Sequence, residues 1–512
     1  MNAFNGYMYG ARLAQNIYHS QQIREFEGAA AKASGCSLYD LMERAGNAVF
    51  VALRQQWPMA QSILVVCGGG NNGGDGYVVA RLAHEAGLKV AVVGQFDDNK
   101  ASADAKLARQ KWLACGQSEI ALVDLDLAGI DVVVDALLGT GVCGVVRAEQ
   151  HDVIAQINAS QLPVISVDVP SGLDADSGKP CGIAINARST VTFIGLKFGV
   201  VSGIGKHYAG QVIFNDLGVQ PAFSHLCDST TLAYHFSNLK PLASRPAHAN
   251  KGNFGRLLCI GGYQGMPGAI RLCAEAALRT GAGLVKVLCH PQSQASVSIG
   301  RPEIMLADPE SLDEHLRWAT TIVIGPGLAQ NPWAIALVEP VLAYQQQHGI
   351  PMVVDADALN ILSKKSQQLN KNVVITPHPG EASRLLNTSV PEIEQQRLQS
   401  TQQLQQQFNC ISLLKGAGTV IAGAQQHSAV CCDGNSGMAT AGMGDVLSGI
   451  IGGLMAQGLS AEHSAVYGVA LHAAAGDLCA NNYGQRGLLA SDMMPCIRKL
   501  INEHDLPTTP NK

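Results

Sequence analysis

Residues 63–76 read ILVVCGGGNNGGDG, a short apolar run followed by a turn rich in glycine. The run predicts a buried β-strand over Ile63–Cys67, and the glycines predict a turn over Gly68–Gly76. A helix is expected to follow over Tyr77–Ala86. This strand–turn–helix unit is typical of α/β folds, in which ligands bind at the carboxyl ends of parallel strands.

The same arrangement recurs along the chain, with apolar strands predicted at Val90–Val93, Asp131–Val134 and Val164–Val167. Because these strands are apolar throughout, they predict a parallel sheet that is covered on both faces. A second series of strands is predicted at Leu257–Ile260, Leu284–Leu288, Ile322–Ile324, Met352–Val354, Val373–Ile375 and Ile411–Leu414. Two long apolar helices are expected near Asp445–Gln457 and His463–Cys479. The predicted fold class is α/β with two doubly wound domains.

The 512 residues are too many for one ordinary domain. Between about 222 and 250 the periodicity stops and Ser, Pro, His and Asn accumulate, which marks a domain boundary. We therefore expect domains over residues 18–222 and 235–508.

Composition excludes several classes of protein. The net charge of −5 argues against nucleic acid or an anionic membrane as a partner. The 14 cysteines form no CxxC pair, which favours a reducing compartment over a disulfide or zinc scaffold. Without a long apolar run no membrane span is expected. Residues 1–24 contain Arg12 and Arg24 but no acid and no secretory pattern, so a loose leader and a cytoplasmic location are predicted.

Gly68, Gly70 and Gly73 satisfy the G-x-G-x-x-G pattern of dinucleotide-binding turns. However, Asn72 and Asp75 crowd the place where a pyrophosphate needs bare backbone amides, and a carboxylate repels phosphate. An ordinary dehydrogenase is therefore disfavoured. The alternative is a purely structural turn, with Asp75 as a helix cap.

Other polar residues follow neighbouring strands, namely Asp135, Asp168 and Ser171. With Asn72 they are expected to meet at one sheet edge, where mixed oxygen ligands suit a hard cation such as sodium or potassium. Asp168 is either a turn cap or a catalytic acid/base. The chain has no nucleophilic triad and no Walker lysine, so proton transfer by a carboxylate is the predicted chemistry.

The second half carries NSGMATAGMGD at Asn435–Asp445, directly before a predicted helix. Gly442, Met443 and Gly444 place backbone amides at the helix start, an anion hole for a transferring phosphoryl group. Asp445 is positioned to accept a proton from an attacking hydroxyl. The alternative is a glycine-rich helix start that Asp445 merely caps.

Further polar strand ends lie in this half. Lys415–Thr419 (KGAGT) either holds nucleotide phosphates or is a surface turn. Asp355–Asn360 (DADALN) suits a substrate or a hydrated magnesium ion. His378 is either a satisfied loop histidine or a ligand contact, and Gly327 permits close approach of a ligand to the backbone.

Together these motifs resemble the bifunctional NAD(P)H-hydrate repair enzymes, which fuse an NAD(P)HX epimerase to an ADP-dependent NAD(P)HX dehydratase. The resemblance spans roughly residues 18–508. In the first half it rests on NNGGDG, VDALLGTG and DVPSGLD, and in the second on GMPGA, GPGL, DADALN, TPHPGE, KGAGT and NSGMATAGMGD. It implies a Rossmann-like N-terminal domain and a ribokinase-like C-terminal domain.

The resemblance also implies roles for individual residues. The potassium ligands would be Asn72, Asp135 and Ser171. The epimerase would bind hydrate through Asn71, Asn72, Gly73, Gly74, Asp75, Gly139, Thr140, Gly141, Val142, Cys143, Gly144, Val145 and Asp168, with Asp168 as acid/base. The dehydratase would bind hydrate through Ala269, Gly327, His378 and Asp445, with Asp445 catalytic. ADP would lie on Lys415, Gly416, Ala417, Gly418, Thr419, Asn435, Ser436, Gly437, Met438, Ala439, Thr440, Ala441, Gly442, Met443 and Gly444.

The implied substrates are NADHX and NADPHX, with ADP as co-substrate and potassium and magnesium as cofactors. The epimerase would interconvert the R and S hydrates, and the dehydratase would return S-hydrate to NADH or NADPH, giving AMP and phosphate. A homo-oligomer is compatible with the resemblance. The alternative function is an ATP-dependent kinase for a vitamin-precursor alcohol, with a non-catalytic N-terminal binding domain.

Overall fold

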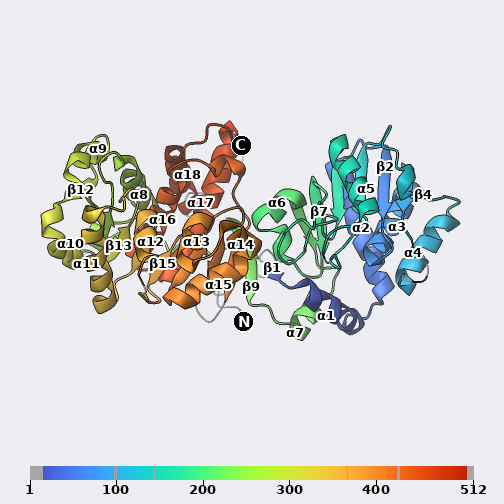
Figure 1. Cartoon of the computed structure of the whole chain (residues 1–512), viewed down its shortest axis with the longest axis horizontal. Coiled ribbons are helices and arrows are strands. Elements are labelled where there is room, and N and C mark those ends of the chain that lie inside the picture. The colour runs from blue at the N-terminus through green and yellow to red at the C-terminus, as the bar shows by residue number, and fades with distance from the viewer. Residues whose placement is uncertain are drawn as a thin grey trace. The chain divides into compact units, whose positions relative to one another are not determined.

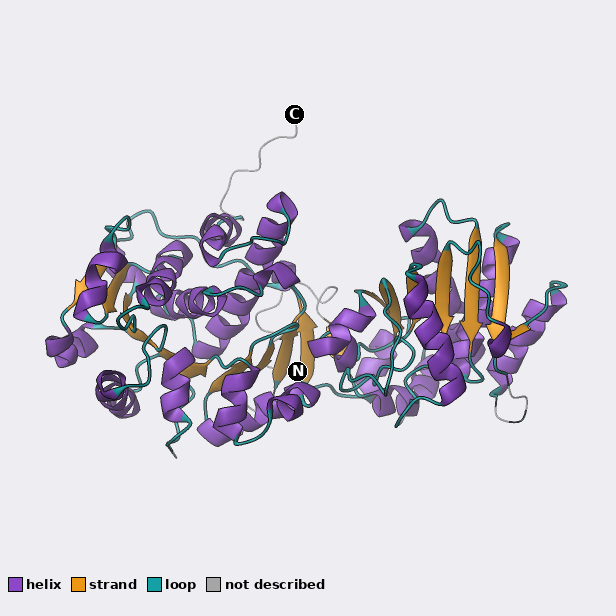
Figure 2. Cartoon of the chain, turned by 45° about the horizontal axis from the view of Figure 1, so that its top comes forward, coloured by secondary structure: helices purple, strands orange, loops and turns teal. Residues whose placement is uncertain are grey.

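The computed structural model describes residues 15–96, 99, 101–142, 144–365, 367–423 and 427–503. The chain divides into two compact units, which we call the N-terminal unit (Gln15–Thr230) and the C-terminal unit (from Thr231). The division lies between the predicted segments 18–222 and 235–508. Both units combine helices with a central sheet (Figures 1 and 2).

The N-terminal unit is built on a seven-stranded sheet in the order β4-β3-β2-β5-β6-β7-β8, and every neighbouring pair is parallel. Strand order reverses between β2 and β5, as in the classic Rossmann fold, whose ligands bind at this switch point. The strands are β2 (Ser62–Cys67), β3 (Lys89–Gly94), β4 (Ile120–Ala121), β5 (Val132–Ala136), β6 (Val164–Val167), β7 (Ser189–Phe193) and β8 (Gln211–Asn215), and a short β1 (Gln15–Ile17) precedes them.

Helices cover both faces of this sheet. Alternate residues of β2 belong to two different cores: Val65 packs with α1–α4, whereas Leu64 and Val66 pack with α5. The Rossmann-like prediction is thereby confirmed. The helices are α1 (Ser20–Ala33), α2 (Leu38–Gln56), α3 (Asn71–Glu85), α4 (Ala103–Ala114), α5 (Ala148–Ser160), α6 (Gly203–Ala209) and α7 (Gln220–Leu226).

The sheet of the C-terminal unit runs in the order β9-β18-β17-β16-β15-β14-β13-β10-β11-β12. It is parallel except that β17 is antiparallel to both β16 and β18, which the sequence analysis did not predict. The strands are β9 (Thr231–Tyr234), β10 (Arg256–Ile260), β11 (Leu284–Leu288), β12 (Ile304–Ala307), β13 (Thr321–Ile324), β14 (Met352–Val354), β15 (Val373–Ile375), β16 (Ile411–Leu414), β17 (Val420–Ala422) and β18 (Ser428–Cys431).

This second sheet is also covered on both faces. Val353 packs in a core with α8, α16, α17 and α18, while its neighbours Met352 and Val354 face the other side and are fully buried as well. The helices are α8 (Pro267–Thr280), α9 (Gln294–Ser298), α10 (Leu312–Trp318), α11 (Pro332–His348), α12 (Ala356–Leu362), α13 (Pro379–Leu386), α14 (Val390–Gln395), α15 (Arg397–Phe408), α16 (Met443–Ala456), α17 (Ala461–Tyr483) and α18 (Met493–Ile501). The predicted α/β class is confirmed for both units.

Candidate active sites

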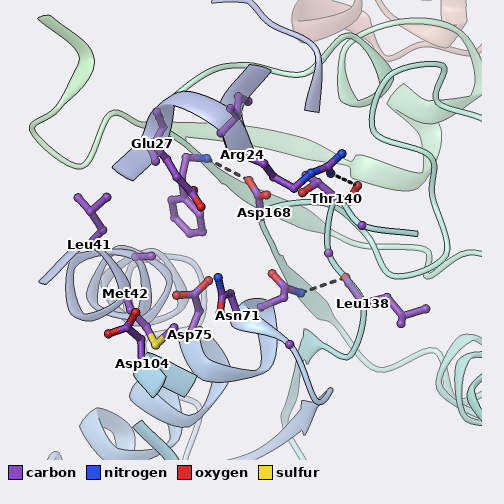
Figure 3. Close-up of a pocket in the computed structure, with 18 of the residues that line it drawn as sticks. Arg24, Glu27, Leu41, Met42, Asn71, Asp75, Asp104, Leu138, Thr140 and Asp168 are labelled. Atoms are coloured by element: carbon purple, nitrogen blue, oxygen red, sulfur yellow. Dashed lines mark hydrogen bonds between the residues drawn. The ribbon is translucent and has the colours of Figure 1, made fainter. Parts of the chain in front are cut away.

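A cavity of about 450 Å³ lies at the switch point of the N-terminal unit. Its wall includes the start of α3, the loop after β5, and Asp168, which directly follows β6. The N-terminal helices α1 and α2 also contribute to the wall, with Arg24, Glu27 and Met42 among the lining side chains (Figure 3). The cavity is therefore where a Rossmann-like sheet is expected to hold its ligand.

The glycine-rich stretch after β2 is helical earlier than predicted. Helix α3 begins at Asn71, not at Tyr77, and Gly70 is its N-cap. Asn71, Asn72 and Asp75 thus belong to the start of the helix and line the cavity. The alternative in which Asp75 caps the helix is wrong, because Asp75 lies inside the helix.

Gly73 and Gly74 have a different role from their neighbours, since neither lines the cavity. A Cβ on Gly73 would collide with the backbone of Gly68, and one on Gly74 would press on Met42. These glycines let α3 pack tightly against β2 and α2. They support the shape of the site and do not form its surface.

Asp135, in β5, is the most buried carboxylate of this edge, with a side-chain environment of hydroxyls and amides. It accepts hydrogen bonds from Ser166 Oγ (2.7 Å) and from both the amide (2.8 Å) and the hydroxyl of Ser171. Burial raises the pKa of Asp135, although these donors partly offset the effect. A buried carboxylate with only neutral donors suits a bound cation.

Of the three residues predicted to bind potassium, Ser171 contacts Asp135, and Ser171 and Asn72 share one carbonyl oxygen. The hydroxyl of Ser171 lies 3.1 Å from Leu138 O, and Asn72 Nδ2 donates to the same oxygen at 3.0 Å. Among the described residues no group of three or more His, Cys, Asp or Glu side chains is placed to hold a metal. A cation here would therefore depend on amide, hydroxyl and carbonyl oxygens beside Asp135, which are ligands typical of a hard alkali ion.

Asp168 has a backbone conformation that side chains rarely adopt, with φ of 65°. Its carboxylate accepts hydrogen bonds from Lys197 Nζ, Thr192 Oγ1 (3.1 Å) and Phe193 N (3.2 Å). Lys197 is itself 1% exposed and also donates to Thr192 and to Phe193 O. Asp168 is thus held rigidly at the cavity wall by a buried ammonium group.

Besides Asp104 of α4, two more carboxyl groups line this cavity, Glu27 from α1 and Asp75 from α3 (Figure 3). Burial and the neighbouring charge of Asp168 raise the pKa of both groups. The sequence analysis missed Glu27 and Lys197. Neither residue lies in a recognisable motif, and only the fold brings them beside Asp168.

The loop after β5 contributes only its first part to the cavity. Gly139, Thr140, Gly141 and Val142 line it, and Arg24 donates to Thr140 O at 2.8 Å. Cys143 lies outside the described residues. The structure does not place Gly144 or Val145 at the cavity, and the Val145 side chain is 81% exposed. The expected contact of Gly144 and Val145 with the hydrate therefore has no support from the lining of this cavity.

In the C-terminal unit, four charged residues from four elements form what we call the lysine cluster: Asp355, Glu381, Lys415 and Asp445. Lys415 Nζ lies 2.9 Å from Asp355 Oδ1 and 3.8 Å from Glu381 Oε2. Asp355 also accepts from Ser448 Oγ at 2.7 Å and is 1% exposed. Asp355 is therefore fully engaged as the buried partner of Lys415, and it is not available to a magnesium ion in this arrangement.

Asp445 is the unpaired acid of this cluster. It lies in the first turn of α16, and burial together with the Asp355 carboxylate raises the pKa of Asp445 to about 7. Burial alone would lower the pKa of Lys415, but Asp355 and Glu381 raise it overall. A carboxyl group with a pKa near neutrality can both take up and release protons at physiological pH.

The predicted hydrate contacts lie on neighbouring elements. A Cβ on Gly327, where φ is 59°, would touch Ala269, so these two residues are adjacent. His378 caps α13, accepts from Gly380 N at 3.0 Å and lies 3.4 Å from Glu381 Oε1. Burial and Lys415 lower the pKa of His378. His378 and Asp445 are thus both linked to the lysine cluster, and the His378 side chain remains about half exposed.

The KGAGT turn is held from behind by Arg397, a buried residue of α15. Its guanidinium donates to Leu414 O (3.3 Å) and Lys415 O (3.2 Å). Gly416 and Ala417 are exposed, while Gly418 is buried and Thr419 Oγ1 donates to Gly416 O. The Lys415 side chain turns towards Asp355, so only the backbone of the turn is left to meet a nucleotide.

The stretch Asn435–Gly444 is anchored by α17. Asp477 accepts from Gly434 N (2.8 Å) and Asn435 Nδ2 (2.7 Å), while Ser436 Oγ bonds to Gln485. The side chains of Met438 and Met443 pack into the hydrophobic core. Ala439, Thr440 and Ala441 form the exposed to half-exposed middle, and Gly442, with φ of 89°, starts α16. The sequence analysis missed Asp477, an acid within an otherwise apolar helix.

None of the described helices combines the length and the apolar character needed to cross a bilayer.

Comparison with known proteins identifies both units. Residues 38–199 match the family described as YjeF-related protein N-terminus, and residues 257–499 match the one described as NAD(P)H-hydrate dehydratase. A bifunctional NAD(P)H-hydrate repair enzyme of Coxiella burnetii is 45% identical over 495 residues, which are 95% of this chain and 99% of the relative. The Escherichia coli K12 enzyme of the same description is 43% identical, covering 96% and 95%.

A solved structure of a ribokinase-like superfamily protein from Enterococcus faecalis V583 aligns with a TM-score of 0.48 and 31% identity, over 52% of this chain and 92% of that one. The sequence relatives extend over nearly the whole length of both partners and include both halves. The predicted resemblance is confirmed: the chain belongs to the family of bifunctional NAD(P)H-hydrate repair enzymes.

Proposed function

We propose that the chain repairs hydrated NADH and NADPH, with isomerisation of R- and S-hydrate in the N-terminal unit and ADP-dependent dehydration of S-hydrate in the C-terminal unit. The observation that carries this proposal is Asp445. It is a carboxyl group with a pKa of about 7 in the first turn of α16, a helix that begins at Met443 with Gly442 as its N-cap. Family membership supplies the substrate class.

In the dehydratase, Asp445 takes the proton of the substrate hydroxyl while the terminal phosphoryl group of ADP transfers to the oxygen. The amides at the start of α16 stabilise the charge that develops on the phosphoryl oxygens. Lys415 sets the charge of the cluster through Asp355 and Glu381. The ring nitrogen assists the departure of phosphate, the neighbouring ring carbon then loses a proton to water, and NADH or NADPH is formed, with AMP and phosphate as the other products.

The substrates of this unit have separate surfaces. Ala269, Gly327 and His378 would hold the hydrate next to Asp445. The backbone of the KGAGT turn and of Asn435–Gly444 would hold ADP. Magnesium would enter with the phosphates of ADP and would neutralise part of their charge.

In the isomerase, Asp168 takes and returns the proton of the hydroxyl group of the hydrate, and Asn71, Asn72 and Asp75 bind the substrate at the start of α3. Potassium would be held by Asn72, Asp135 and Ser171, where its charge would screen the phosphates of the substrate. If so, isomerisation slows when potassium is replaced by tetramethylammonium, whereas inorganic buffer anions have no effect.

The first experiment is an absorbance assay on mixed R/S hydrated NADH, with magnesium, potassium and either ADP or ATP. Full recovery of reduced-nicotinamide absorbance with ADP, faster than spontaneous isomerisation allows, is the expected result. Recovery of the S fraction alone would contradict the isomerase. A stable phosphoester product without recovery would replace the dehydratase by a small-molecule kinase.

We also propose an intracellular, reducing location. No disulfide joins any of the described cysteines, most of which are buried.

A further inference from the structure

The cavity of the N-terminal unit holds more acid–base groups than the proposed role of Asp168 uses. Four carboxyl groups line it from four parts of the chain: Glu27 from α1, Asp75 from α3, Asp104 from α4 and Asp168 after β6 (Figure 3). Lys197 pairs with Asp168. No described residue donates a hydrogen bond to the carboxyl group of Glu27 or Asp75, so both are available to a ligand.

Glu27 is the neighbour of Asp168 across the cavity wall. Their charges influence each other directly, and Figure 3 shows both side chains pointing into the same space. The groups that face Glu27 are Asp168 and Lys197 from the sheet edge, Asp75 from α3, and Arg24 on its own helix. Arg24 is committed to Thr140 O, and Lys197 already donates to three oxygens.

We propose that Glu27 is the second catalytic residue of the isomerase, a general acid that works with Asp168 on two atoms bonded to the same carbon. This inference rests on the proposed isomerase function of the N-terminal unit. It gives helix α1 a part in the chemistry, although α1 lies before residues 38–199, which match the family.

The step balances without any further reactant. The hydroxyl-bearing carbon of the hydrate is also bonded to the ring nitrogen. Asp168 takes the hydroxyl proton, the C–O bond becomes C=O, and the C–N bond breaks while Glu27 gives its proton to the nitrogen. The aldehyde then rotates and the nitrogen attacks its opposite face. The nitrogen returns its proton to Glu27, and Asp168 returns its proton to the oxygen.

This division of roles agrees with the different environments of the two carboxyl groups. Asp168 accepts hydrogen bonds from a buried ammonium group and two further donors, whereas no described residue donates one to the carboxyl group of Glu27. Burial and Asp168 raise the pKa of Glu27. Neighbouring carboxyl groups in such different environments are the usual arrangement of an acid paired with a base.

The test uses the full chain with saturating ADP, magnesium and potassium on mixed R/S hydrated NADH. The S fraction disappears in a fast phase, and the R fraction follows in a slow phase limited by isomerisation. Glu27→Gln keeps the size of the side chain but cannot supply the proton. We expect the slow phase to fall by about 10²–10⁴-fold towards the spontaneous rate, with the fast phase unchanged.

The matched control is Glu25→Gln, an exposed carboxylate on the same helix, which should leave both phases unchanged. A purely structural role of Glu27 would raise KM or lower the melting temperature, whereas an acid role lowers kcat. If Glu27 is the acid, the wild-type rate of the slow phase falls at high pH, and this fall is absent in Glu27→Gln. If Glu27→Gln unfolds the unit, Glu27→Asp keeps the carboxyl group and should retain a slow phase with the same pH limb.

The outcomes separate the two proposals. A wild-type slow phase no faster than the spontaneous rate would overturn the isomerase function itself. A normal wild-type slow phase that Glu27→Gln changes by less than about threefold would overturn the role of Glu27 alone. So would loss of the slow phase in Asp75→Asn with retention in Glu27→Gln, which would make Asp75 the acid.

Discussion

The two active-site edges of this chain both contain a lysine, a carboxylate paired with it and an unpaired carboxyl group, but they place these groups differently. In each, a lysine pairs with one carboxylate while another carboxyl group is unpaired: Lys197 with Asp168 beside Glu27, and Lys415 with Asp355 beside Asp445. At the first edge the paired Asp168 lines the cavity. At the second the paired Asp355 is buried, and Asp445 lies in the first turn of α16.

This difference follows from the chemistry that each edge has to perform. Isomerisation needs an acid and a base that act on atoms bonded to the same carbon, so Glu27 and Asp168 both line the cavity. Phosphoryl transfer needs one proton acceptor and a place for negative charge. There the lysine pair is buried and adjusts the electrostatics, while the amides of α16 are left for the phosphoryl group. Four changes to the chain test this contrast.

The largest effect is expected from Asp445→Asn, which removes the proton acceptor of dehydration without altering its size. Dehydration of S-hydrate should slow by about 10²–10⁴-fold. The isomerisation rate, measured without ADP by chromatographic separation of the R and S forms, should not change. A loss of both activities would show that the two sites are not independent.

The next largest effect concerns stability and the two lysines. Lys415→Met leaves Asp355 buried with only hydroxyl partners, and breaking such a pair costs about 3–5 kcal/mol. Lys197→Met should cost less, about 1–3 kcal/mol, because Asp168 lines a cavity that water can enter. Denaturant unfolding of the two variants measures the difference. Equal losses of unfolding free energy would contradict the difference that we assign to the two carboxylates, with Asp355 buried and Asp168 lining a cavity.

The features of the two sites that a short stretch of sequence encodes could be predicted, whereas those that depend on tertiary packing could not. Strands such as β2, β5 and β13 were predicted because their apolar runs are continuous, whereas the buried strands β7, β9, β17 and β18 were missed. Asp168 was predicted because it directly follows a predicted strand, and Asp445 because it follows a glycine-rich turn. The start of α3 was predicted six residues late, since Asn71–Gly76 contains three glycines, which individually disfavour helix. Tertiary packing of Gly73 against Gly68 overrides that preference.

Glu27, Lys197 and Asp477 were missed for a different reason. Each lies in a segment whose local pattern predicts only a helix or a strand end. Each gains its role from a partner distant in sequence: Asp168 for Glu27 and Lys197, and Asn435 for Asp477. The contact between Lys415 and Asp355 was missed in the same way. Sequence motifs located the sites, but the pairing of charges within them required the fold.

The pH dependence of the two activities should run in opposite directions. Asp445 acts in its ionised form, so dehydration should rise about tenfold per pH unit below its pKa of about 7 and level off above it. Isomerisation needs the protonated form of Glu27, whose pKa burial and Asp168 raise, so this rate should fall as the pH rises through that pKa. Two profiles with the same direction would contradict the assignment of a base to one site and an acid to the other.

The smallest effect is expected from Asp477→Asn, which tests whether ADP binding by the stretch Asn435–Gly444 is independent of proton transfer by Asp445. Asp477 accepts from both Gly434 N and Asn435 Nδ2, whereas an asparagine has only one acceptor oxygen for these two donors. The loss of one such hydrogen bond, about 1 kcal/mol, should raise the KM for ADP about fivefold. The kcat should stay within twofold of wild type, because Asp445 and the lysine cluster are untouched. Asn481→Ala, at an exposed position of α17, should leave the KM unchanged. A fall in kcat with an unaltered KM would mean that α17 positions Asp445, and the separation between nucleotide binding and proton transfer in this unit would have to be abandoned.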